Sequence, residues 1–132
     1  MKRLLLVNAI ITPDGMILES THRHDYKTYV DANGEVYMID GGIDYIRTSI
    51  NKEPAKSACV YTDDPHEIIR ESFRWGTYGK DGKQPLMRKT LDSLDTDHIE
   101  AILDTQFHLA DHIIKVFVDE LEYRRIKSCK LN

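Results

Sequence analysis

The sequence has 132 residues, of which 41% are hydrophobic and 30% are charged, and its formal net charge is −4. This length and balance predict a single globular domain over residues 1–132 and exclude a chain that is disordered throughout. No apolar run approaches the roughly 20 residues that a transmembrane helix needs. The apolar start is interrupted too early to be a signal peptide. We therefore expect a cytoplasmic protein without a membrane partner.

Acidic residues outnumber basic ones, 22 to 18. Tight binding to DNA needs a concentrated positive face, because the affinity comes from neutralising phosphates. Basic residues gather only near the C-terminus, at Arg124, Arg125, Lys127 and Lys130. This small group favours a phosphorylated small molecule over DNA. The two cysteines, Cys59 and Cys129, match no zinc or redox spacing and are expected to be free thiols.

Residues 1–62 are predicted to be mainly antiparallel β-sheet. Short apolar segments alternate there with turn sequences, which is typical of strands joined by hairpins. The clearest turn is Asn33-Gly34, because both residues tolerate positive φ and strands flank them. The expected strands span residues 3–12, 16–20, 26–30, 35–39 and 57–62.

Residues 63–132 are predicted to be mainly helical, which makes the fold class α+β. Asp64 and Pro65 are residues that favour the start of a helix, and Gly76 favours its end. The expected elements are a helix between these positions, a glycine-rich loop over residues 76–85, a short strand over 86–91, a helix that begins at 96 and a longer helix from about 109 to 127.

The last predicted helix carries more apolar surface than one core contact uses. Phe117 and Leu121 belong to its main apolar stripe, whereas Val116 and Tyr123 lie on a flanking face. Such a wide stripe suggests a second partner, and a copy of the same chain is the commonest one. We therefore expect a homo-oligomer, with simple burial under the sheet as the alternative.

The segment His22-Arg23-His24-Asp25 is the first candidate for chemistry. On a strand, His22 and His24 would share one face, where they could bind a metal if a third ligand came from elsewhere. No zinc motif accompanies them, so a packed or hydrogen-bonded histidine pair without metal is the favoured interpretation.

A second candidate is the segment from Asp40 to Arg47, which contains adjacent glycines. Glycines let the backbone approach another backbone or a phosphate closely, although they can simply turn the chain. Arg47 could bind a phosphate through its planar fork, or pair with Asp40 or Asp44.

The third candidate lies between residues 70 and 83, where aromatic and basic side chains surround a glycine-rich loop. Its members are Arg70, Phe73, Arg74, Trp75, Tyr78, Lys80 and Lys83. Aromatic rings can stack on a nucleotide base while guanidinium groups hold its phosphates. The alternative is that Phe73 belongs to the core and the arginines form solvated helix pairs. We find no nucleophile, base and acid set, and we predict no catalytic residues and no cofactor.

Several stretches resemble the first-described Thoeris anti-defence family of bacteriophages. They span about residues 6–124 and read NAIITPDG, HRHDY, DANGEVYMIDGG, YTDDPHEIIR, WGTYGKDGKQPL, TDHIEAIL and ELEYR. The resemblance implies a protein in the cytoplasm of the infected bacterial host. Such proteins bind cyclic ADP-ribose isomers made by TIR-domain defence enzymes and sequester them unmodified, so that the downstream effector stays silent.

The resemblance also implies an N-terminal antiparallel sheet, C-terminal helices and dimers, with cyclic oligonucleotides bound at separate sites in some members. An aromatic residue and arginines near the dimer interface form the ligand pocket of the family. The residues here that best suit those roles are Arg70, Phe73, Arg74, Trp75, Arg124 and Arg125.

Two alternatives to a ligand-sequestering protein stay open at this point. One is an enzyme that hydrolyses a signalling nucleotide with His22 or His24 as general acid or base. The other is an inhibitor that binds a host protein through the apolar last helix.

Overall fold

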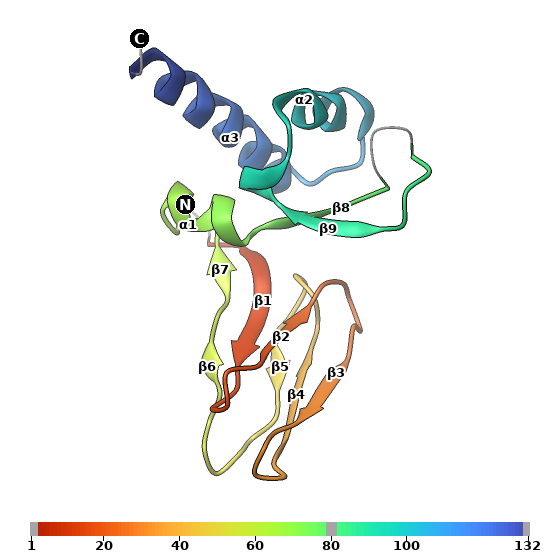
Figure 1. The fold of residues 1–132 in the computed structure, drawn as a ribbon, viewed down its shortest axis with the longest axis vertical. Coiled ribbons are helices and arrows are strands. Elements are labelled where there is room, and N and C mark those ends of the chain that lie inside the picture. Colours follow the sequence, from red (N-terminus) through yellow and green to blue (C-terminus); the bar gives the residue numbers. More distant parts are fainter. Residues whose placement is uncertain (1–2, 79–81, 131–132) are drawn as a thin grey trace. The chain divides into compact units, whose positions relative to one another are not determined.

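The computed structural model describes residues 3–78 and 82–130, the last without its side chain. The fold is mixed α+β, with antiparallel sheets in the N-terminal part and helices in the C-terminal part, as predicted (Figure 1). The chain divides into two compact units, residues 1–63 and 64–132. The division falls one residue from the predicted boundary between the strand half and the helical half, and each unit is described by itself below.

The first unit is built around strand β1 (Leu5–Ile11), whose five central residues are all buried. It pairs antiparallel with β2 (Ile17–Ser20), β6 (Lys56–Ser57) and β7 (Val60–Tyr61). The single strand predicted over 57–62 is two short strands, and the register of the pairing with β1 shifts within β7, between Leu5 and Val7 of β1.

A second antiparallel sheet in this unit has the order β3 (Lys27–Val30), β4 (Val36–Asp40), β5 (Arg47–Thr48). The predicted hairpin between β3 and β4 is confirmed, although only Gly34 of its turn adopts a positive φ, +82°. Asp31 stabilises the turn, because its carboxylate accepts the N–H groups of Asn33 and Glu35 at 2.9 Å. The core that the sheets share contains Ile10, Leu18, Tyr37 and Ile39.

The second unit begins with α1 (His66–Ser72) and a hairpin of β8 (Arg74–Thr77) and β9 (Met87–Thr90). Strand β8 was not predicted, since the sequence favoured a helix up to Gly76. The helix ends earlier because Phe73 turns to an extended conformation, with its N–H bonded to the carbonyl of Ile69. A 3-10 turn (Leu91–Ser93), α2 (Thr96–Thr105) and α3 (Asp111–Lys130) follow.

Helix α3 provides much of the core of the second unit. Phe117 and Val116 are both buried inside the unit, and the ring of Tyr123 packs on His66 with centroids 5.4 Å apart. The flanking face that suggested a second copy is therefore covered, at least at Val116, by the chain itself. The oligomeric state stays a prediction. No helix among the described residues is long and apolar enough to cross a membrane.

Candidate functional site

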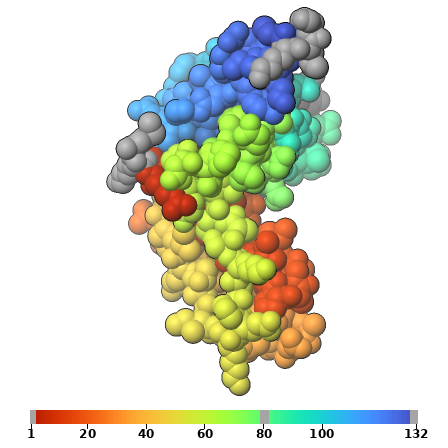
Figure 2. Space-filling view, turned by 90° about the vertical axis from the view of Figure 1, so that its left-hand side faces the viewer, coloured from red at the N-terminus to blue at the C-terminus, as the bar shows by residue number. Residues whose placement is uncertain are grey.

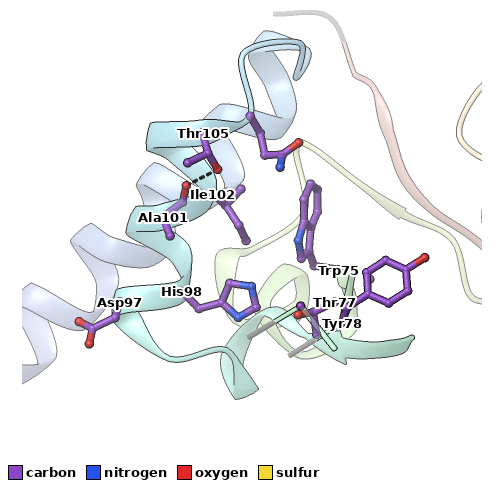
Figure 3. Close-up of a pocket in the computed structure, with 11 residues that line it drawn as sticks. Trp75, Thr77, Tyr78, Asp97, His98, Ala101, Ile102 and Thr105 are labelled. Carbon is purple, nitrogen blue, oxygen red and sulfur yellow. Dashed lines mark hydrogen bonds between the residues drawn. The ribbon is translucent and has the colours of Figure 1, made fainter. Parts of the chain in front are cut away.

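A pocket of about 430 Å³ lies in the second unit, beside the β8–β9 hairpin and helix α2 (Figure 3). This volume falls within the range of small-molecule sites. Its described lining consists of Trp75, Gly76, Thr77, Tyr78, Gly82, Asp97, His98, Ala101, Ile102, Thr105 and Gln106.

Trp75 forms one wall of this pocket, which we call the Trp75 pocket. Alternation along β8 puts Trp75 and Thr77 on the same face of the hairpin. The edge of the indole meets the ring of Phe117 at 5.2 Å between centroids and 87° between planes. The core therefore fixes the orientation of the indole, which stays half-buried and accessible from the pocket. A ring held in this way is suited to stacking on a flat ligand.

The opposite wall comes from one face of α2. His98, Ile102 and Thr105 recur at spacings of four and three, which brings them to the same side of the helix. Figure 3 shows the side chains of His98 and Ile102 facing the indole, while Asp97 points away. Gln106 ends the helix, and its N–H bonds to the carbonyl of Ile102 at 2.9 Å.

Apolar and polar side chains both line the Trp75 pocket. His98 is the only lining side chain, among the residues that the structure describes, that can carry a positive charge. The hydroxyl of Thr105 donates to the carbonyl of Ala101 at 2.7 Å and keeps lone pairs for a ligand. The amide of Gln106 adds a donor and an acceptor. These groups suit the edge of a heteroaromatic ring better than several phosphates.

The structure brings only Trp75, of the six predicted site residues, to this pocket. Phe73 is buried and packs edge-on against Phe117, with centroids 5.8 Å apart. It has the core role that the sequence left open as the alternative, and its ring is covered.

Arg70 and Arg124 meet at a carboxylate that the sequence analysis did not single out, Glu120. Arg70 binds it through two N–H groups, each at 2.9 Å, and Arg124 donates to it at 2.6 Å. His66 adds a contact at 3.0 Å between Nε2 and Oε1. We call this group the Glu120 hub. Both guanidinium groups would have to leave a fully buried partner to reach a phosphate.

The hub determines the ionisation of Glu120. Burial opposes the charged form, but hydrogen bonds from Arg70, Arg124 and His66 outweigh it, so the pKa of Glu120 lies below its ordinary value. Arg124 also donates to the carbonyls of Leu91 and Leu94, which ties α3 to the turn before α2. The hub therefore stabilises the packing of the helices of the second unit.

The other two predicted arginines, Arg74 and Arg125, do not bind Glu120. Arg125 is exposed and forms a two-bond ion pair with Glu122 on the same helix. Arg74 is exposed on β8, and the guanidinium of Arg88 donates to its carbonyl at 3.5 Å. Lys80, which the sequence placed in the same cluster, and the side chain of Lys130 lie outside the described residues.

The histidine segment of the first unit is a turn between β2 and β3, so the strand geometry that a shared metal-binding face would need is not present there. His24 adopts a positive φ of 64°, which breaks the alternation that would have put both histidines on one face. Its Nδ1 lies 3.0 Å from the hydroxyl of Tyr45. Within residues 3–78 and 82–130, no three His, Cys, Asp or Glu side chains are grouped so that they could hold a metal ion.

Sequence reasoning missed Glu120 although its spacing carried a signal. Ile113, Phe117 and Glu120 follow one another at spacings of four and three, so Glu120 belongs to the buried stripe of α3. A carboxylate in such a stripe needs cationic partners, and Arg124 stands four residues further along. No protein-family model, curated protein or solved structure matches this chain.

Proposed function

We propose that this chain binds a cyclic ADP-ribose isomer and sequesters it without changing it, as a bacteriophage anti-defence protein in the cytoplasm of its host. The observation that carries the proposal is the Trp75 pocket, in which a half-buried indole faces polar side chains from α2. The resemblance of the sequence to the Thoeris anti-defence family suggests the ligand class, and the Trp75 pocket is the location that we propose for it.

In this proposal the adenine of the ligand stacks on Trp75. Gln106 and Thr105 bind the edge of the base, and His98 is the expected contact of the pyrophosphate. Arg70 and Arg124 hold the pocket wall in place through the Glu120 hub, rather than contacting the ligand. Arg74 and Arg125 do not line this pocket, and the separate prediction that they contact phosphate is tested by titrating Arg74→Ala and Arg125→Ala.

A protein that acts by sequestration affects its target only through mass action. Free ligand falls appreciably when the protein exceeds both the ligand and the dissociation constant, so binding must be tight. We also propose that the protein works as a homo-oligomer, and light scattering at micromolar concentration tests this.

The experiment is calorimetric titration of the protein with the purified cyclic product of a TIR-domain enzyme. We expect the double variant His98→Ala/Gln106→Ala to weaken binding by about 2–4 kcal/mol, roughly 30- to 1,000-fold. Glu100→Ala is the matched control, because Glu100 is exposed on the same helix and does not line the pocket. Equal affinities for the double variant and the control would contradict this site.

The same sample distinguishes the alternatives. Mass spectrometry of the ligand released by denaturation should return the cyclic compound intact, whereas an enzyme would return a hydrolysis product. An inhibitor that binds only a host protein would give no heat with the nucleotide. Either result would overturn the proposal.

A further inference from the structure

The first unit carries a cluster of polar and charged side chains that the proposed function does not use. The turn at residues 22–25 and the segment from Asp40 to Arg47 meet there, and part of the segment after β4 is visible at the surface in yellow (Figure 2). We propose that this cluster, the Asp40 cluster, is a separate binding site for a terminal phosphoryl group, such as that of a phosphate monoester.

The centre of the cluster is a buried carboxylate that uses only one of its oxygens. The side chain of Asp40 is 6% exposed. Its Oδ2 accepts the Nη2–H of Arg47 at 3.0 Å and the hydroxyl of Tyr45 at 3.3 Å. Its Oδ1 is buried and has no hydrogen-bond partner among the described residues. A buried acceptor without a partner is destabilising. We therefore infer that the carboxylate of Asp40 serves to orient Tyr45 and Arg47.

Tyr45 carries this orientation to His24. Because its hydroxyl donates to Asp40, its lone pair is left to accept a hydrogen bond from Nδ1 of His24, 3.0 Å away. Burial, followed by the charge of Asp40, raises the pKa of Tyr45, so the phenol remains a donor at neutral pH. This arrangement assigns the Nδ1–H tautomer to His24 and leaves Nε2 on an exposed side chain.

Arg47 is oriented by the same carboxylate and yet is mostly in solvent, with 61% of its side chain exposed. A guanidinium has five N–H donors, and the structure shows one of them bonded to Asp40. Arg23 is exposed on the facing turn, and its charge acts on the pKa of Tyr45 together with that of Arg47. The exposed guanidinium of Arg47 and the imidazole of His24 thus meet beside the hydroxyl of Tyr45, an arrangement that can bind a phosphoryl group.

Asp40 already balances part of the charge of Arg47, whereas Asp25 is engaged by other groups. Asp25 accepts the N–H of Thr21 at 2.7 Å and pairs with Lys27 at 3.3 Å, and its distance to Nε2 of His22 is 3.9 Å. Asp44 is exposed on the same segment as Arg47.

The two segments are held together before any ligand arrives. Gly42 has a φ of +54°, and a Cβ there would lie 2.3 Å from the carbonyl carbon of His22. Its N–H bonds to the hydroxyl of Ser20 at 2.8 Å, and that hydroxyl donates to the carbonyl of Asp25 at 2.7 Å. A site fixed in this way loses little entropy on binding.

The test is an NMR titration of the histidine side chains with inorganic phosphate and with adenosine 5′-monophosphate, using adenosine as the silent control. We expect both phosphates to shift the His24 resonances, Arg47→Ala to weaken binding about tenfold, and Lys52→Ala to leave it unchanged. If the His24 resonances respond only to inorganic phosphate, the ligand is the free anion. If they respond also to adenosine 5′-monophosphate, the site accepts phosphate monoesters as well.

Tyr45→Phe tests the positioning role, because it removes the link to His24 and leaves the ion pair of Arg47. We expect weaker phosphate binding and loss of the preference of His24 for the Nδ1–H tautomer. Absence of a His24 response at millimolar phosphate, or one unaffected by Arg47→Ala, would overturn the proposal. Neither result bears on the Trp75 pocket, because the variants and the observed resonances belong to the first unit.

Discussion

Replacement of Glu120 by glutamine removes the negative charge at the centre of the hub and keeps the shape of the side chain. Glu120 is fully buried and accepts four hydrogen bonds, from His66, Arg70 and Arg124. Glutamine has one acceptor oxygen and an NH₂ group that would face donors, so at least two charge-assisted bonds are lost. Each is worth about 1.5–3 kcal/mol.

Some of this loss is offset, because the buried carboxylate no longer needs to be desolvated and the side chains of Arg70 and Arg124 keep about a fifth of their surface in solvent. We expect Glu120→Gln to lower the free energy of unfolding by about 3 kcal/mol. For a unit of this size that corresponds to a fall in Tm of roughly 12–24 °C.

Thermal unfolding followed by circular dichroism measures this loss. The matched control is Glu122→Gln on the same helix, whose exposed pair with Arg125 should contribute less than about 1 kcal/mol. A Tm for Glu120→Gln within a few degrees of that control would refute the assignment of the hub as a stabilising network.

Three further predictions follow from burial, backbone geometry and charge. Because the pKa of Glu120 is lowered in the folded state, its contribution to the free energy of unfolding is complete above the ordinary glutamate pKa near 4.5 and is lost as pH falls through the pKa of the folded state. Glu120→Gln should therefore lose less stability in acid than the parent protein, as measured by urea midpoints. Phe117→Ala should cost about 3–5 kcal/mol of unfolding free energy, because the ring is fully buried within one unit, and an oligomer that dissociates without loss of Tm would contradict this. Gly42→Ala should destabilise by at least about 2 kcal/mol because the backbone of His22 blocks the Cβ, whereas Gly34→Ala, with open space around it, should cost about 1 kcal/mol by chemical denaturation; similar losses at both positions would argue against the close approach of the two segments.

The sequence by itself predicted the α+β class and most of the longer strands and helices. Turn residues such as Gly34 and the apolar periodicity of α2 and α3 are local signals, and local geometry follows from them. It also predicted Trp75 as a candidate ligand contact, and in the structure this residue lines a pocket. Strand β8 was not predicted because its partner β9 lies ten or more residues further along the chain. A pairing of that kind depends on contacts that no local pattern encodes.

Only the tertiary structure decided what the charged residues do. Arg70 and Arg124 looked like phosphate contacts because a guanidinium in a sequence has no visible partner, and their carboxylate lies 50 residues from Arg70. Asp40 and His24 are likewise joined through Tyr45 across the turn between two sheets. The energy of a charge depends on its burial and on its nearest opposite charge. Both are set by packing between distant segments, so they appear only once the chain is folded.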